Sequence, residues 1–216
     1  MQYDMYHHFT VDEHTIFAIG VLWKIEQGLI KGEVPIASEV VHLVQSRRVL
    51  YLAVLLHDIA KGRRGDHSEL GADIALKLGP RLGFSDEETE TVAWLVRYHL
   101  IMSNTAFKRD IDDPKTIQDF VARVQSPERL KLLLLLTIAD IRAVGPKVWN
   151  GWKAALLREL YHRAFELMSG GIDATAREER VRQAQEAVRK LLPDFASAEV
   201  DAFISKGYPF DWLSFD

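Results

Sequence analysis

The stretch Leu50-Tyr51-Leu52-Ala53-Val54-Leu55-Leu56-His57-Asp58-Ile59-Ala60-Lys61-Gly62 opens with seven residues that are almost all aliphatic. An apolar run this dense predicts a helix, from about Arg47 to Ala60, that is buried on most of its surface. The run leads into an imidazole and a carboxylate, and burying such groups is unfavourable unless something compensates them. Divalent transition metals bind both kinds of side chain, and Asp58 could bridge two of them. The stretch therefore predicts that His57 and Asp58 begin a metal site.

The composition is that of an ordinary globular protein with one substantial core. Of the 216 residues, 48% are hydrophobic and 27% are charged. The net charge of -4 argues against a general nucleic-acid binder. No apolar run approaches the about 20 residues of a membrane span, and the N-terminus lacks the pattern of a signal peptide, so we expect a cytoplasmic protein. Because the chain has no cysteine, a metal must be held by nitrogen and oxygen, which draws attention to the eight histidines.

Helical patterns extend over nearly the whole chain, without strand-like alternation of useful length. A second aliphatic run, Leu132–Leu136, predicts another deeply buried helix over residues 130–141. Asp113-Pro114 and Ser126-Pro127 are typical of helix starts, with a capping side chain before a proline. The polar segment 102–112 is expected to be a loop. We therefore predict an all-α fold, a helical bundle of roughly eight to ten helices.

Further histidines and acids recur on successive predicted helices. His14 lies early in the first amphipathic helix, and Asp140 lies at the C-terminal end of the second aliphatic helix. His67 follows the His-Asp pair on the next helix, and His99 closes the helix after that. One such residue per helix is the pattern of a site built between packed helices.

Structural roles remain open for several of these residues. His57 and Asp58 could form a hydrogen-bonded pair that needs no metal. Asp140 could cap a helix or pair with Arg142. Lys61 follows the His-Asp pair by one helical turn, and its ammonium could hold a phosphoryl oxygen as a point charge. It could instead interact with the C-terminal end of its own helix dipole.

The order His14, His57-Asp58, Asp140 resembles the signature of the HD superfamily of metal-dependent phosphohydrolases. The sequence His57-Asp58-Ile59-Ala60-Lys61 resembles the His-Asp-Ile-Gly-Lys motif of HD-GYP phosphodiesterases. However, Ala60 replaces the glycine and no GYP signature follows. Longer stretches are similar to the HD domain of the bifunctional PII uridylyltransferase/uridylyl-removing enzyme family. They are Tyr6-His7-His8-Phe9-Thr10-Val11-Asp12-Glu13-His14-Thr15, residues 57–68 (ending Gly62-Arg63-Arg64-Gly65-Asp66-His67-Ser68), and residues 136–146 followed by Trp149-Asn150 and Trp152-Lys153.

That resemblance, which covers most of residues 3–170, implies an activity and a set of ligands. The domain would hydrolyse the tyrosyl-UMP bond of uridylylated PII, a trimeric nitrogen-signalling protein, and release UMP. One or two divalent metals are implied, with Mn, Mg, Fe, Co and Zn all open. The implied roles are first-metal ligation by His14, His57, Asp58 and Asp140, second-metal ligation by His67 and His99, bridging by Asp58, and catalytic roles for Asp58 and Lys61.

The resemblance also predicts a domain organisation. Residues 1–170 would form the HD domain, and residues 171–216 a C-terminal helical extension that leads towards a missing domain. A nucleotidyltransferase domain would precede residue 1, and glutamine-sensing ACT domains would follow residue 216. Two other functions stay open: another HD phosphohydrolase acting on a free nucleotide or a cyclic dinucleotide, and an HD fold kept as a non-catalytic regulatory module.

Overall fold

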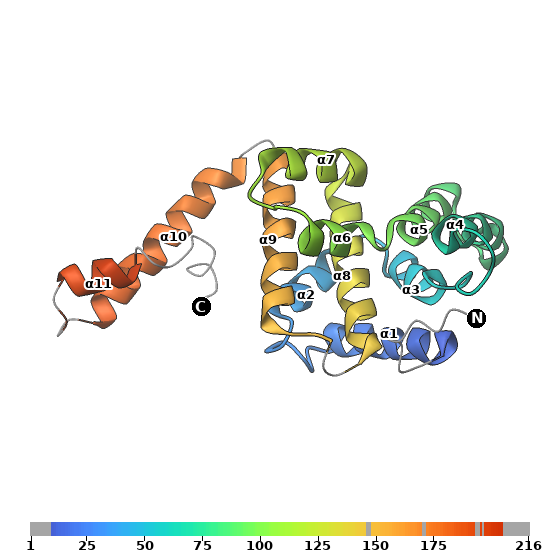
Figure 1. The fold of residues 1–216 in the computed structure, drawn as a ribbon, viewed down its shortest axis with the longest axis horizontal. Coiled ribbons are helices and arrows are strands. Elements are labelled where there is room, and N and C mark those ends of the chain that lie inside the picture. The colour runs from blue at the N-terminus through green and yellow to red at the C-terminus, as the bar shows by residue number, and fades with distance from the viewer. Residues whose placement is uncertain (1–9, 146–147, 170–171, 193–194, 196, 205–216) are drawn as a thin grey trace. The chain divides into compact units, whose positions relative to one another are not determined.

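The structure is a computed structural model that describes residues 10–145, 148–169, 172–192, 195 and 197–204 (Figure 1). The chain divides into two compact units, residues 1–164 and 165–216, and each is described by itself. The described residues form helices and no strand, which confirms the all-α class. The beginning of the first predicted motif, residues 6–9, lies outside the described residues.

The helices of the first unit are α1 (Val11–Glu26), α2 (Pro35–Val40), the 3-10 helix η1 (Val41–Leu43), α3 (Arg47–Leu56), α4 (His67–Leu78), the 3-10 helix η2 (Pro80–Leu82), α5 (Asp86–Tyr98), α6 (Ile101–Lys108), α7 (Pro114–Val124) and α8 (Pro127–Val144). Helix α9 (Gly151–Met168) continues past the boundary between the units. The second unit contains α10 (Ile172–Leu191) and α11 (Ser197–Ile204), and Val200 and Ile204 of α11 form its buried cluster.

Helix α8 is the central helix of the first unit. It packs against α1 and α3 and also contacts α2, α5, α6 and α7. Its leucines 132–136 are all buried, as the aliphatic run predicted. The start is also as predicted, because the Ser126 hydroxyl accepts the backbone N–H of Arg129 and Pro127 occupies the first helical position. Asp140 therefore lies within a core helix, about one turn before its end.

The helix of the opening stretch ends four residues earlier than predicted. Helix α3 stops at Leu56, and the backbone N–H groups of Ile59, Lys61 and Arg63 then bond to carbonyls three residues earlier. These tight turns lead to Gly62, whose φ of 83° suits a residue without a Cβ. The apolar pattern could not show this end, because Ile59 and Ala60 are compatible with a longer helix. His57 and Asp58 thus follow the last turn of α3 instead of lying inside it.

The prediction that residues 102–112 form a loop is wrong for most of that segment. Helix α6 occupies Ile101–Lys108, and its buried residues Met102, Thr105 and Ala106 recur at intervals of three and one, which places them on one face. Because most residues of this segment are polar, its narrow buried face was not recognised in the sequence. Helix α6 contacts α7.

Helices α4 and α5 pack closely in the first unit. The contact depends on Gly71, because a Cβ at this position would lie 2.9 Å from Val96 Cγ1. Since α4 begins at His67 and α5 ends next to His99, the close packing brings these two histidines to the same end of the helix pair. Among the helices of the described residues, none is long and apolar enough to cross a membrane.

Candidate metal centre

Five helices of the first unit, α1, α3, α4, α5 and α8, bring the predicted ligands together. His14 lies in the first turn of α1, which is capped by a hydrogen bond from the Thr10 N–H to Glu13 Oε2. His57 and His99 directly follow α3 and α5, and Asp140 lies on α8. The packing of α1, α3 and α5 around α8 therefore carries distant parts of the sequence to one place.

One group of candidate ligands consists of His14, His57 and Asp140, whose ligand atoms all lie within 4.8 Å of one another. His14 Nε2 is 3.2 Å from His57 Nε2 and 3.0 Å from Asp140 Oδ1. His57 Nε2 is 3.7 Å from the same Asp140 oxygen. Both imidazoles are almost fully buried. Two imidazole nitrogens and a carboxylate oxygen converge here as ligands of a divalent metal would.

The second group consists of Asp58, His67 and His99, again with ligand atoms within 4.8 Å of one another. Asp58 Oδ1 is 3.7 Å from His67 Nε2 and 3.9 Å from His99 Nε2. Asp58 and His99 are buried, whereas the His67 side chain keeps 30% of its surface exposed. This group is therefore open to solvent on the His67 side.

Asp58, a member of the second group, also faces the first group with its other oxygen. Its Oδ1 faces His67 and His99, while its Oδ2 is 3.8 Å from His57 Nε2 and 4.0 Å from His14 Nε2. The Lys61 ammonium also contacts Oδ2, at 2.7 Å. The carboxylate thus has the placement of a bridging ligand, and Lys61 shares one of its oxygens.

Backbone carbonyls orient two of the imidazoles. His57 Nδ1 lies 2.7 Å from the Val54 carbonyl, and His99 Nδ1 lies 2.7 Å from the Val96 carbonyl. Because a carbonyl only accepts, each Nδ1 carries a hydrogen and donates it. In the neutral ring this leaves the lone pair on Nε2, the atom that faces the carboxylates. Histidines that bind metals are typically oriented by such a second hydrogen bond, so the residues present fit a divalent metal.

The charges of the first group favour a cation. Burial by itself raises the pKa of Asp140, but the adjacent imidazoles of His14 and His57 outweigh it and hold this pKa well below the usual range. Burial by itself lowers the pKa of His57, but the nearby Asp140 carboxylate raises it overall. A carboxylate that stays ionised and an imidazole drawn towards positive charge are the electrostatic conditions for holding a metal ion.

His99, in the second group, behaves differently from His57. Burial, assisted by the nearby His57, lowers the pKa of His99 and so favours its neutral form. A neutral imidazole is the form that binds a metal. Burial opposes ionisation of Asp58, but the charge of His57 and the hydrogen bond from Lys61 lower the pKa of this carboxyl overall. Both residues are therefore in the protonation state that a metal ligand needs.

The structure brings all six residues that the sequence proposed as ligands into these two groups, with Lys61 at their junction. The sequence did not predict a pocket between α6 and α7, whose lining includes Arg109 and Arg123. The signal available for it was the helical spacing of the buried residues in the segment that had been expected to be a loop. That spacing places α6 against α7, but no motif marks the pocket.

Two clustered sets of histidine and aspartate in an all-helical unit define a protein of the HD class, a family of hydrolases whose domains bind divalent metals. A family model described as HD domain matches residues 28–144, and the chain belongs to this family. The match includes every candidate ligand except His14.

The chain is also similar to individual proteins along its whole length. The chain is 64% identical over 216 residues to the bifunctional uridylyltransferase/uridylyl-removing enzyme of Azospirillum brasilense, and 59% identical over 216 residues to that of Rhodospirillum rubrum. In both comparisons the match covers 100% of this chain and 23% of the relative. The enzyme of the same name from Cereibacter sphaeroides is 50% identical over 98% of the chain. The chain thus spans about a quarter of the length of the curated relatives it matches.

Proposed function

We propose that this chain hydrolyses the tyrosyl-UMP bond of uridylylated PII and releases UMP. The observation that carries the proposal is the placement of Asp58, with one oxygen towards His14 and His57 and the other towards His67 and His99. A carboxylate placed between two ligand groups suits a phosphodiester hydrolase with two metals. The relatives' name supplies the uridylyl-removing activity.

We assign His14, His57 and Asp140 to one metal and His67 and His99 to a second, with Asp58 between them. When bound, divalent metals supply Lewis acidity that activates water and neutralises charge on a phosphoryl group. The protein contributes rigidity, because the buried ends of α3 and α5 and the core helix α8 hold the ligands in place. Which metal is held, and whether one or two, stays open between Mn, Mg, Fe, Co and Zn.

Lys61 has the placement of a residue that contacts the phosphoryl group. Its side chain is 29% exposed, while its ammonium lies against the buried Asp58 carboxylate. The Lys61 side chain can therefore contact a substrate that approaches from solvent while it stays next to Asp58. An ammonium at this position stabilises the negative charge that develops on a phosphoryl oxygen during hydrolysis.

The accessible side of the centre is consistent with a protein substrate. His14, His57 and His99 are buried, whereas His67 and Lys61 are partly exposed, so substrate must approach over these two side chains. Ile59 and Leu100, which directly follow the ligands Asp58 and His99, keep 42% and 38% of their surface exposed. Such aliphatic residues beside an active centre suit contact with a folded partner better than with a free nucleotide.

The experiment is a hydrolysis assay with uridylylated PII, the chain and a divalent metal, in which released UMP is quantified by chromatography. His57→Ala and Asp58→Asn should abolish release, while His42→Gln, at an exposed histidine outside both groups, should retain it. A parallel panel of free nucleotides and cyclic dinucleotides tests the other HD activities. Turnover of a free substrate but not of uridylylated PII would contradict the proposal, as would full activity of both centre variants. Metal binding without any turnover would support the non-catalytic alternative.

The wider organisation of the protein also remains a proposal. The greater length of the relatives agrees with the nucleotidyltransferase and ACT domains that the resemblance implied. Uridylyl transfer, the other activity in their name, is not assigned to the residues of this metal centre. The limits 1–170 for the HD domain and 171–216 for the C-terminal extension stay predictions.

A further inference from the structure

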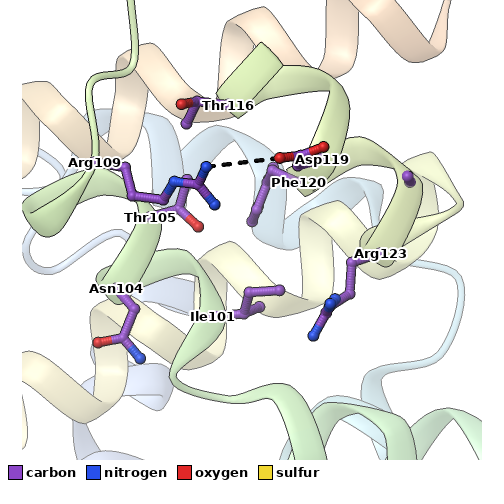
Figure 2. Close-up of a pocket in the computed structure, with 9 residues that line it drawn as sticks. Ile101, Asn104, Thr105, Arg109, Thr116, Asp119, Phe120 and Arg123 are labelled. Atoms are coloured by element: carbon purple, nitrogen blue, oxygen red, sulfur yellow. Dashed lines mark ion pairs between the residues drawn. The ribbon is translucent and has the colours of Figure 1, made fainter. Parts of the chain in front are cut away.

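A pocket of about 530 Å³ lies between α6 and α7, built from residues that the metal centre does not use (Figure 2). Its volume is in the range of sites that bind small molecules. The lining residues come from both helices and the segment between them, and they include Ile101, Thr105, Arg109, Asp119, Phe120 and Arg123.

The pocket carries more positive than negative charge. Arg109 and Arg123 are its two cations and Asp119 is its one anion. The Arg109 guanidinium is 3.6 Å from Asp119 Oδ2, a distance that attracts it without a close hydrogen bond. Arg123 is placed by the ring of Tyr98, whose centre lies 5.7 Å from the guanidinium carbon. The two guanidinium groups keep donors for an incoming anion.

Thr105 adds a polar group to this lining. The residue is only 7% exposed, and its side chain is one of those that line the pocket. In Figure 2 its oxygen points towards the space between Arg109 and Ile101. A hydroxyl can donate a hydrogen bond to an anionic ligand in the pocket.

The remaining walls are apolar. Phe120 is 2% exposed, and Figure 2 shows its side chain and that of Ile101 pointing into the pocket from α7 and α6. A ligand that satisfies both kinds of surface has an anionic group for the arginines and a compact ring or aliphatic body for Phe120 and Ile101. Two guanidinium groups and a hydroxyl offer more donors than one carboxylate can use, and a phosphate with its three terminal oxygens matches them better.

We propose that the pocket between α6 and α7 binds a small organic phosphate of about mononucleotide size, with its phosphate on Arg109, Arg123 and Thr105 and its body against Phe120 and Ile101. This site is distinct in its residues from the metal centre. It does not depend on the proposed hydrolysis of uridylylated PII.

The test is calorimetric titration of the chain with UMP, phenyl phosphate, uridine and inorganic phosphate, with EDTA present so that metals do not bind phosphate. UMP or phenyl phosphate should bind, and more tightly than either uridine or inorganic phosphate, because only the first two carry both a body and a phosphate. If neither organic phosphate binds at millimolar concentration, the proposal is overturned.

Variants locate the site and define the sign of its charge. Arg123→Gln and Thr105→Val should each weaken binding, by about tenfold for the loss of the charged partner. Asp119→Asn should strengthen binding, because it removes the anion that opposes the phosphate. His57→Ala should leave binding unchanged. Binding that is lost in His57→Ala but kept in Arg123→Gln would place the ligand at the metal centre, and weaker binding in Asp119→Asn would mean a cationic or zwitterionic ligand. Either result overturns the proposal.

Discussion

The Nε2 atoms of His14 and His57 lie 3.2 Å apart, although 43 positions of sequence separate the two residues. His57 keeps its Nδ1 hydrogen on the Val54 carbonyl, so its neutral ring directs a lone pair towards His14. Asp140 Oδ1 lies 3.0 Å from His14 Nε2 and adds negative charge. These atoms favour a shared positive charge, which a proton or a metal ion can provide.

Metal binding should stabilise the folded chain. A ligand that binds only the folded state at a hundred times its dissociation constant adds about 2.7 kcal/mol to the free energy of unfolding. Thermal denaturation with and without EDTA should therefore show a higher Tm in the presence of metal. His57→Ala should lose the increase, and His42→Gln should keep it. An equal response in both variants would mean that the metal binds elsewhere.

Metal stoichiometry should separate the two ligand groups. His99→Gln removes a ligand of the second group only, so the chain should lose one metal equivalent and keep the other. Asp58→Asn weakens the residue that both groups face and should lower the occupancy of both. Elemental analysis after reconstitution and dialysis measures the equivalents. The bridging role is wrong if Asp58→Asn retains as much metal as the unmodified chain.

Lys61→Met should have opposite effects on metal affinity and on hydrolysis. Its ammonium lies 2.7 Å from Asp58 Oδ2, so removing it relieves repulsion of a metal at that oxygen and should tighten metal binding. Hydrolysis should fall by about a hundredfold, the scale for losing one group that stabilises developing charge. Titration calorimetry measures the affinity and UMP release measures the rate.

The exposed Lys24 offers a control for that substitution, since Lys24→Met removes the same charge far from any candidate ligand in sequence. This variant should change neither quantity. A purely structural Lys61 would show weaker or unchanged metal binding in Lys61→Met, without a specific loss of rate.

Gly71→Ala should destabilise the contact between α4 and α5. The added Cβ would approach Val96 Cγ1 to 2.9 Å, and overpacking of this kind costs about 1–3 kcal/mol. Because the same contact holds His67 near His99, affinity for the second metal should also fall. Gly20→Ala is the matched control: nothing lies within 4 Å of a Cβ there, and alanine in the interior of α1 should add up to about 1 kcal/mol. Urea denaturation measures both. Equal effects of the two substitutions would contradict this account of the packing.

The sequence was most informative where a physical pattern is local. The leucines of α8 and the Ser126-Pro127 start predicted a buried helix because apolar spacing and capping act within a few residues. It was least informative about where helices end and about helices with only a narrow buried face. Helix α3 stops before Ile59 and Ala60 although both residues fit a helix, and α6 forms in a polar segment because Met102 and Ala106 find a buried surface supplied by other helices.

By itself, the sequence determined the chemistry of the candidate centre: nitrogen and oxygen ligands only, an all-helical scaffold, and the residues that fit an HD signature. The resemblance also implied how those residues divide between two metals, and only the tertiary structure decided how far apart their ligand atoms lie. It placed His14, His57 and Asp140 together, placed His67 and His99 on the other side of Asp58, and put Lys61 on the shared carboxylate. The physical reason is that distances between side chains on different helices depend on how α1, α3, α4, α5 and α8 pack, and no local pattern of residues contains that information.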